Sequence, residues 1–347
     1  MTTITKDVAI IGAGPVGLFA VFQCGMLGLS AVVIDSLSDI GGQCSALYPE
    51  KPIYDIPGFP SVAAGDLIAH LEAQATPFEP EYLLGQTVEK LENVSNGDIF
   101  NLTTSAGNVI LAKAVIIAAG GGAFGPNRPP LDGLQDYEGK SVFYMVRRRE
   151  DFRGKRVVIA GGGDSAVDWA LSLADIAASV MVVHRRDQFR AVPESVTRMR
   201  TLAAEGRIDM VVPYQLHGLD GADGKLSAVI VSDLDGNEKR LEADILLPFF
   251  GLASSLGPIA DWGLDIAHHH IAVNPGTAET NVPGVYAIGD IASYSHKLKL
   301  ILTGFADAAQ ASHAIYQRIN PGVALHMEYS TTKGLPQALM EASKAKA

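Results

Sequence analysis

The chain has 347 residues, which suits two domains of ordinary size, and 48% of them are hydrophobic, so each domain can bury its own core. A formal net charge of -11 at pH 7 argues against generic binding to nucleic acid. The two cysteines, Cys24 and Cys44, are too few for a disulfide scaffold and indicate a reducing compartment.

The N-terminal region begins with a buried strand that runs into a glycine-rich turn and a helix. The strand starts at Val8, and the turn reads Gly12-Ala-Gly14-Pro-Val-Gly17. The first glycine permits a sharp turn, the second lets backbone N–H groups approach a pyrophosphate, and the third lets helix and strand pack closely. The pyrophosphate lies at the helix N-terminus, where the dipole favours negative charge. This motif explains the apolarity of the region, so we expect a cytoplasmic protein with no signal peptide or membrane span.

The second strand, residues 31–35, ends on Asp35, whose carboxylate can accept hydrogen bonds from ribose hydroxyls. A carboxylate repels a 2′-phosphate, so this unit suits FAD or NAD, and we assign it FAD. Cys44 follows Gly41-Gly-Gln43 in a loop that we expect to face the cofactor.

Shorter strands complete the first domain. Residues 100–104 and 109–111 indicate two strands around a turn at Gly107. Residues 114–119 indicate a further buried strand, and the glycines that follow it, 120–122, suit a crossing into a second domain.

A second strand–turn–helix–strand unit follows the same plan. Its turn reads Gly161-Gly-Gly163-Asp164-Ser165-Ala166, and its second strand ends on His184-Arg185-Arg186. Gly12 and Asp35 are 23 positions apart, and so are Gly161 and His184. Because a guanidinium fork matches phosphate geometry, Arg185 and Arg186 favour the 2′-phosphate of NADP(H). The alternative is a solvated basic turn.

Arginines are concentrated around this second unit. Of the 14 arginines, 13 lie between Arg128 and Arg240, which indicates a stretch that handles anions or an acidic partner. Four of them, just before the second glycine turn, form a candidate docking patch: Arg147, Arg148, Arg149 and Arg153. The alternative is a solvated helix face.

The chain then returns to the first domain. Residues 246–251 suit the return crossing, residues 285–290 a strand that ends on Asp290, and residues 300–319 an apolar helix. His268-His-His270 is expected to be a solvent loop, because three consecutive side chains rarely converge on a metal ion.

The predicted fold class is α/β, with two Rossmann-like dinucleotide-binding domains, the second inserted into the first. Residues 1–120 plus 252–347 are predicted to bind FAD, and residues 121–251 are predicted to bind NADPH.

The string Thr280-Asn-Val-Pro-Gly-Val-Tyr-Ala-Ile-Gly-Asp290 resembles the second FAD motif of the flavoprotein disulfide reductase superfamily, thioredoxin-reductase type. Such reductases carry a C-x-x-C just before the second glycine turn, which residues 142–155 lack, so electrons cannot pass to a resident disulfide. Residues 41–58 and the extension Tyr329-Ser-Thr331-Thr instead resemble the ferredoxin–NADP reductases of the thioredoxin-reductase-like type. That resemblance spans almost the whole chain.

The resemblance implies a role for each matching residue. Tyr48 stacks on one flavin face and Tyr329 covers the other, which makes these two the catalytic positions. The remaining FAD contacts that it implies are Asp35, Gln43, Val88 through its backbone, Phe124, Asp290 and Thr331, with Ser330 as the alternative to Thr331. Glutamate is usual at the ribose position, and Asp35 is one methylene shorter.

The activity implied is hydride transfer from NADPH to FAD, followed by single-electron transfer to an acidic ferredoxin. A homodimer is implied by the family alone. The alternatives are a reductase for flavodoxin, a quinone or a thioredoxin-like partner, and a non-catalytic flavin sensor. Asp290, Gln43 and both glycine turns argue against the sensor.

Overall fold

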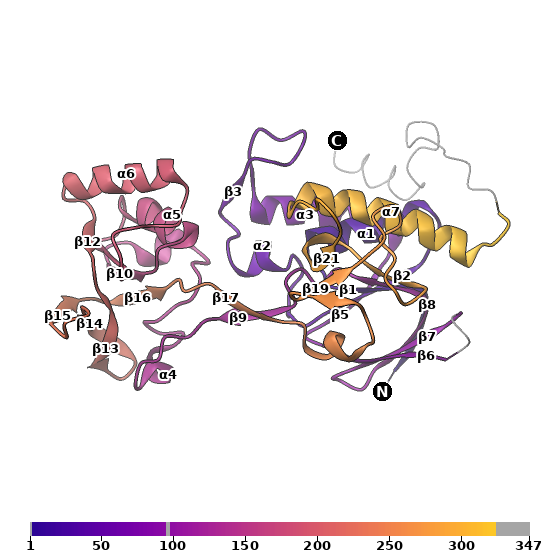
Figure 1. Cartoon of the computed structure of the whole chain (residues 1–347), viewed down its shortest axis with the longest axis horizontal. Coiled ribbons are helices and arrows are strands. Elements are labelled where there is room, and N and C mark those ends of the chain that lie inside the picture. Colours follow the sequence, from indigo (N-terminus) through magenta and orange to yellow (C-terminus); the bar gives the residue numbers. More distant parts are fainter. Residues whose placement is uncertain (1, 95–97, 324–347) are drawn as a thin grey trace. The chain divides into compact units, whose positions relative to one another are not determined.

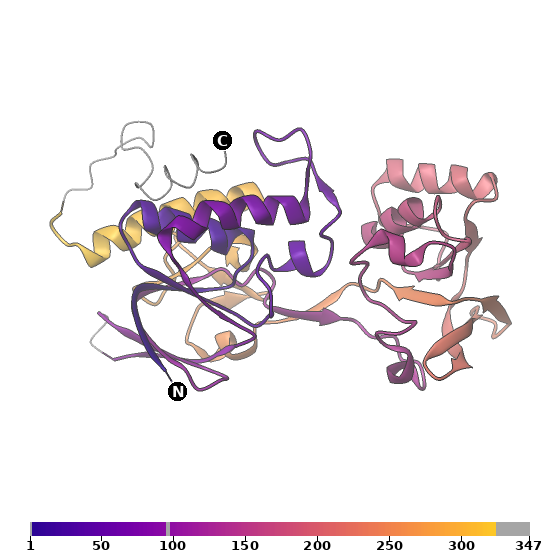
Figure 2. The same ribbon diagram turned by 180° about the vertical axis from the view of Figure 1, so that it is seen from behind.

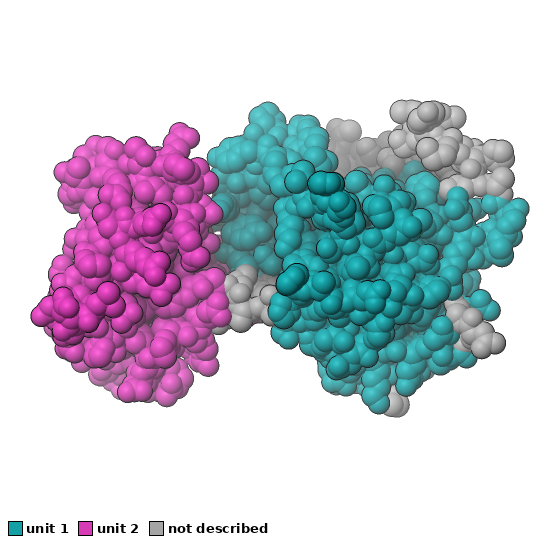
Figure 3. Space-filling view, viewed as in Figure 1, with its two compact units in different colours: residues 1–123, 254–347 teal, residues 124–253 magenta. Residues whose placement is uncertain are grey.

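The computed structural model describes residues 2–94 and 98–323, and the chain divides into two compact units (Figure 3). Unit 1 comprises residues 1–123 and 254–347, and unit 2 comprises residues 124–253. The two crossings pair with each other as strands β9 (Ala123–Pro126) and β17 (Leu252–Ser255). That residues 1–120 plus 252–347 bind FAD and residues 121–251 bind NADPH stays a prediction.

Unit 1 is built on a seven-stranded sheet (Figure 1). Its main path runs β5 (Glu81–Leu84), β2 (Ala31–Asp35), β1 (Thr3–Ile11), β8 (Val109–Ile117), β7 (Phe100–Thr104) and β6 (Val88–Asn93). Strand β20 (Val285–Ala287) pairs in parallel with the end of β8, while β6 and β7 are antiparallel. Parallel strands are normally buried on both faces, which explains the unbroken Val and Ile runs of β1 and β8.

Three helices lie on one face of this sheet: α1 (Pro15–Met26), α3 (Ala64–Ala75) and α7 (Ile301–Ile319) (Figures 1 and 2). Unit 1 also contains several shorter elements: α2 (Gln43–Ala46), β3 (Pro52–Ile53), β4 (Val62–Ala63), η1 (Thr76–Phe78), η3 (Gly257–Asp261), β18 (Ile266–Ala267), β19 (His270–Ala272), η4 (Gly289–Ile291) and β21 (Ala292–Ser293). Among the described residues, no helix has the length and apolar character needed to cross a bilayer.

Strand β8 differs from the prediction, because it joins two expected strands into one. The polar residue between them, Lys113, stays exposed at the sheet surface and its ammonium pairs with Asp7 of β1 at 2.8 Å. A strand alternates its side chains between two faces, so one solvated lysine need not interrupt it.

Unit 2 repeats the strand–turn–helix–strand plan. Its parallel sheet has the order β12 (Asp209–Val211), β11 (Ser179–Val183), β10 (Arg156–Ala160) and β16 (Ile245–Pro248). Helices α5 (Asp164–Leu173) and α6 (Pro193–Ala204) follow β10 and β11. An antiparallel sheet of β13 (Gln215–Ala222), β14 (Lys225–Ser232) and β15 (Glu238–Glu242) and the short α4 (Leu134–Tyr137) and η2 (Arg149–Phe152) complete the unit. The predicted α/β fold class with two Rossmann-like sheets is confirmed.

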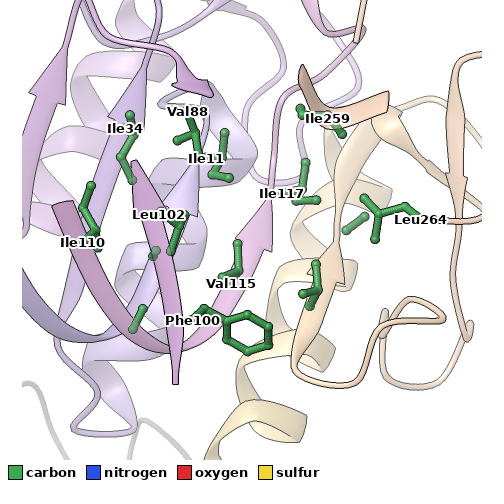
Figure 4. Close-up of a cluster of buried hydrophobic side chains, with 14 of the residues drawn as sticks. Ile11, Ile34, Val88, Phe100, Leu102, Ile110, Val115, Ile117, Ile259 and Leu264 are labelled. Atoms are coloured by element: carbon green, nitrogen blue, oxygen red, sulfur yellow. The ribbon is translucent and has the colours of Figure 1, made fainter. Parts of the chain in front are cut away.

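One hydrophobic cluster in unit 1 fixes the strand ends that matter for function (Figure 4). Ile11 precedes Gly12, Ile34 precedes Asp35, and both lie beside Val88 at the start of β6. Burial of one such aliphatic side chain stabilises the fold by roughly 1.5–3 kcal/mol. The cluster therefore ties three separate segments of the predicted FAD site to one rigid core.

Two candidate dinucleotide sites

The first glycine turn accepts only glycine at two of its three positions. Gly12 has φ +114°, and a Cβ there would lie 2.4 Å from the carbonyl oxygen of Ala118. A Cβ on Gly17 would lie 1.9 Å from the carbonyl oxygen of Gly12, so α1 rests directly on the turn. These two glycines hold the strand and helix at the separation that a dinucleotide turn needs.

Gly14 is different, because a Cβ at this position would have none of the described atoms within 4 Å. Gly14 is also the residue that caps the N-terminus of α1, and no described side chain forms a capping hydrogen bond to it. Backbone N–H groups at the start of a helix need acceptors, and a phosphate supplies them. The open space beside Gly14 therefore fits a pyrophosphate.

Asp35 lies at the end of β2 and is bonded to the turn itself. One carboxylate oxygen accepts a hydrogen bond from the Ala13 N–H at 2.6 Å, and the other accepts one from Leu37 N–H at 2.8 Å. Burial raises the pKa of Asp35, and these two hydrogen bonds oppose that rise. Because each carboxylate oxygen has two lone pairs, the group retains acceptor capacity for ribose hydroxyls.

The segment before β6 is tied to the same edge of the sheet. The carbonyl oxygen of Asp35 accepts a hydrogen bond from Gln86 N–H at 2.9 Å. The side chain of Val88 is buried in the core beside Ile11 and Ile34, so only its backbone is left to meet a ligand (Figure 4). That its backbone lies by the adenine stays a prediction.

The loop that carries Gln43 is hydrogen-bonded to the first turn. Gly41 N–H donates to the carbonyl of Ala13 at 2.8 Å, and a Cβ on Gly42 would lie 3.1 Å from the Cα of Gly14. Gln43 then begins α2. Cys44 was expected in a loop, but it lies in this short helix and is buried, because α2 packs on α3.

Tyr48 and Asp290 come from distant parts of the sequence, and the charge of Asp290 acts on the Tyr48 hydroxyl. Burial raises the pKa of the Tyr48 hydroxyl, and the nearby Cys44 and the charge of Asp290 raise it further. Asp290 is exposed in η4, next to Gly289, which has φ +74°. The residues that precede Gln43 and Asp290 thus lie against the start of α1, at Gly14 and Val16, and Tyr48 packs on the hydrophobic cluster that contains Leu18 of the same helix.

Sequence reasoning missed a buried polar cluster behind Asp290. Asp307 of α7 accepts a hydrogen bond from Gly289 N–H at 2.9 Å and forms an ion pair with Lys297. The Tyr294 hydroxyl donates to the same carboxylate at 3.0 Å. A charged residue in the apolar pattern of residues 300–319 was the one signal in the sequence that pointed to this cluster.

In the second glycine turn, as in the first, one glycine is required by close backbone contact and another lies beside open space. Gly161 has φ +153°, and a Cβ there would lie 2.6 Å from the carbonyl oxygen of Phe249. Gly163 caps the N-terminus of α5, and its Cβ would meet none of the described atoms within 4 Å. Asp164 and Ser165 begin α5, and the Asp164 carboxylate accepts a hydrogen bond from Val192 N–H at 2.9 Å. This turn also fits a pyrophosphate.

A group of cations lies at the end of β11, beside this turn. Burial lowers the pKa of His184, a hydrogen bond with the Gln188 backbone opposes this, and the charges of Arg185, Arg190 and Arg186 lower it further. A Cβ on Gly162 would lie 2.3 Å from Nε2 of His184, so the ring covers the turn. Arg190 was not singled out from the sequence, although it follows Arg185 and Arg186 in the same loop.

These arginines differ from most others in unit 2. Within the described ranges, none of Arg185, Arg186 and Arg190 forms an ion pair with an acidic side chain. In the candidate docking patch, by contrast, Arg148 pairs with Asp151, Arg149 with Asp175, and Arg153 with Glu150. These local pairs favour the solvated-face alternative for that patch.

Several predicted positions fall outside what is described. Tyr329, Ser330 and Thr331 lie beyond residue 323, and the side chain of Phe124 in β9 also lies outside the described part. His268 and His269 form the turn between β18 and β19, both with positive φ. In residues 2–94 and 98–323, no three His, Cys, Asp or Glu side chains come together as a metal site.

Comparison with known proteins supports the same interpretation. Residues 6–317 match the family described as pyridine nucleotide-disulphide oxidoreductase. A ferredoxin–NADP reductase of Granulibacter bethesdensis is 62% identical over 96% of this chain and 95% of its own length. One of Acidiphilium cryptum is 61% identical over 96% and 98%. The structure of T. acidophilum thioredoxin reductase matches with a TM-score of 0.75 and 25% identity, over 90% of this chain and 98% of that one.

Proposed function

Because this chain belongs to the pyridine nucleotide-disulphide oxidoreductase family, we propose that it is a ferredoxin–NADP reductase with FAD in unit 1 and NADP(H) in unit 2. One observation carries the proposal. Two dinucleotide turns of the same geometry end differently, the first on the carboxylate of Asp35 and the second on the arginines that follow His184. Bound FAD supplies hydride acceptance and one-electron transfer, which joins a two-electron donor to an iron–sulfur acceptor.

In unit 1, the turn around Gly14 and the start of α1 bind the pyrophosphate of FAD, and Asp35 binds the ribose. The Tyr48 ring stacks on the flavin and helps to exclude water, since an aromatic face suits a planar ring. Gln43, Asp290 and, as the resemblance implies for the C-terminal extension, Thr331 or Ser330 would orient the flavin ring and its ribityl chain. The resemblance implies that Tyr329, which lies outside the described residues, would cover the opposite flavin face.

In unit 2, the turn from Gly161 to Gly163 binds the pyrophosphate of NADP(H) at the start of α5. Arg185 and Arg186 bind the 2′-phosphate, because these cations have no acidic partner among the described side chains and stay available to an anion. Arg190 adds a third positive charge beside them.

The proposed electron acceptor is a ferredoxin, which the names of the similar proteins support, and the chain offers no thiol pair as an internal acceptor. Its two cysteines are free and buried, Cys24 in α1 and Cys44 in α2. Burial raises the pKa of the Cys24 thiol to about 11, and the nucleophile in thiol exchange is the thiolate. We further propose a homodimer, as the family resemblance implies, and a cytoplasmic location, which the two cysteines support by indicating a reducing compartment.

The purified protein should bind FAD, and NADPH should bleach its yellow colour without oxygen. Turnover should then be followed as NADPH-driven reduction of cytochrome c with and without a bacterial ferredoxin, with thioredoxin and NADH as comparisons. We expect ferredoxin to raise the rate strongly and thioredoxin to leave it unchanged. A rate that is independent of ferredoxin would overturn the choice of acceptor, and a folded protein that binds no FAD would overturn the proposal as a whole.

A further inference from the structure

The ion pair between Lys297 and Asp307 is almost completely buried. Their side chains are 5% and 2% exposed, whereas the Lys113–Asp7 pair in the same unit leaves 51% and 23% exposed. Removing two charges from water costs several kcal/mol per ion, and the attraction between them often does no more than offset that cost. The attraction between the two charges alone therefore does not explain why the pair is buried, and the other contacts of Asp307 must be considered.

The contacts of Asp307 show what the pair holds in place. Its carboxylate accepts hydrogen bonds from Gly289 N–H at 2.9 Å and from the Tyr294 hydroxyl at 3.0 Å, in addition to its ion pair with Lys297. The ammonium of Lys297 also lies 5.0 Å from the centre of the Tyr294 ring. Burial and Asp307 raise the pKa of Tyr294 to about 12, so its hydroxyl remains a donor at neutral pH. One carboxylate thus links α7, the η4 turn and the segment between them.

This cluster lies where the starts of two helices meet. A Cβ on Gly304 of α7 would lie 2.4 Å from a methyl carbon of Val16 in α1 and 3.3 Å from the Cα of Gly289. Gly289 has φ +74°, a conformation that glycine adopts readily, and Asp290 follows it. Any shift of the η4 turn would therefore move Asp290 relative to the start of α1.

We propose that Lys297 and Asp307 form a positioning pair that holds the Gly289–Asp290 turn for the flavin and thereby sets FAD affinity and the reduction potential of the bound flavin. This inference rests on the proposed FAD site in unit 1. Neither residue touches the cofactor in the proposal. The pair acts through the hydrogen bond from the Gly289 N–H to Asp307, which fixes the position of η4 relative to α7.

The test compares D307N and the double variant K297M/D307L with wild type. The matched control is K113M/D7L, which removes the ion pair between β1 and β8 in the same sheet. FAD is stripped from each protein, and the fold of the apoprotein is measured by circular dichroism and urea unfolding. FAD affinity is then measured by quenching of flavin fluorescence, and the midpoint potential by equilibration with reference dyes.

We expect K297M/D307L to fold, but with a lower urea midpoint than wild type, because the Gly289 N–H and the Tyr294 hydroxyl lose their acceptor. Its FAD affinity should fall at least tenfold, while the control changes less than twofold. If the loss differs tenfold between oxidised and reduced flavin, the midpoint potential shifts by about 30 mV for a two-electron couple. D307N keeps an acceptor oxygen for Gly289 N–H, so its FAD affinity should lie between those of the double variant and wild type.

Folded variants whose FAD affinity and midpoint potential stay within twofold and 10 mV of wild type would overturn the positioning role alone. If K297M/D307L does not fold, D307N decides the question by the same two measurements. A wild-type protein that folds but binds no FAD would overturn the proposed function itself, and the positioning role with it.

Discussion

Alanine at Gly14 and alanine at Gly163 should separate the two nucleotide sites. Gly14 has φ -69° and ψ 179°, and Gly163 has φ -98° and ψ -178°, which are extended conformations that alanine adopts without strain. The ψ of Gly14 also suits a residue that precedes a proline, here Pro15. At either position the added methyl group would meet none of the described atoms within 4 Å. Neither substitution should therefore disturb the fold.

The expected change in stability is small because two effects oppose each other. Alanine caps a helix less well than glycine, at a cost of roughly 0.5–1 kcal/mol. Replacing glycine by alanine at a compatible φ lowers the entropy of the unfolded chain and restores about 0.4–1 kcal/mol. The free energy of unfolding of G14A and G163A should thus stay within about 1 kcal/mol of wild type. G12A is the contrasting variant, because its Cβ would lie 2.4 Å from a backbone oxygen.

The effect on binding should be much larger. The methyl group would occupy the open space that a pyrophosphate needs in order to reach the backbone N–H groups. A hydrogen bond to a charged group contributes about 1.5–3 kcal/mol, so loss of one such bond weakens binding roughly 10- to 150-fold. We expect G14A to lose FAD affinity and keep NADPH affinity, and G163A to do the reverse.

Each variant is the control for the other. FAD affinity is measured by titrating the apoproteins, NADPH affinity by calorimetry with the flavin oxidised and oxygen removed, and stability by urea unfolding. The reasoning fails if either variant binds both nucleotides as tightly as wild type. It also fails if G14A weakens NADPH binding and spares FAD, because the two turns would then hold the opposite nucleotides.

Two further predictions concern the end of β11. R185A/R186A should raise the KM for NADPH at least tenfold and leave that for NADH within twofold; equal changes would remove the 2′-phosphate assignment. The pKa of His184 lies below its ordinary value of 6.5, so its stabilising contribution is complete above pH 6.5 and is lost as the pH falls through the folded-state pKa. The urea midpoint of unit 2, followed by Trp169 fluorescence in a W262F background, should fall less between pH 7.5 and 5.5 in H184Q than in wild type. Parallel losses would show that His184 does not carry the effect.

The glycine turns could be predicted from sequence because their physical demands are local. Gly12 and Gly161 each adopt a φ that glycine tolerates best, and each must follow a buried strand and precede a helix. These constraints fix the number of residues between the first glycine of each turn and the end of the second strand, so the sequence alone shows them. The pairing of the crossing strands β9 and β17 is not local, because they are distant in sequence, and it was not predicted.

The Lys297–Asp307 pair could not be predicted in the same way. Charged side chains are usually exposed, so both residues read as surface positions of a polar segment and of an amphipathic helix. Their burial depends on the close approach of Gly304 to Val16 and Gly289, which comes from packing between distant segments. The strand β8 was split for a related reason, because Lys113 reads as an interruption until its partner Asp7 is placed beside it.

The number of arginines in residues 128–240 did not show which of them pair with nearby acidic side chains. It indicated anion handling across residues 128–240, yet the structure assigns many of these arginines to nearby acids: Arg128 to Glu138, Arg156 to Asp244, Arg200 to Asp187, Arg207 to Asp175 and Arg240 to Asp220. A paired guanidinium on the surface presents little net field to an incoming anion. The field at the second turn must come from the arginines that act on His184 and lack an acidic partner among the described residues.

A dependence on salt follows from this difference. The Debye length falls from about 10 Å at 0.1 M to about 3 Å at 1 M salt, so attraction between exposed arginines and a 2′-phosphate weakens as salt rises. The KM for NADPH should rise several-fold between 0.05 and 0.5 M NaCl, and that for NADH much less, because NADH lacks the 2′-phosphate. R185A/R186A should flatten the NADPH curve to the NADH slope. Equal slopes for both nucleotides in the wild-type enzyme would mean that Arg185 and Arg186 do not face the adenosine end of the nucleotide.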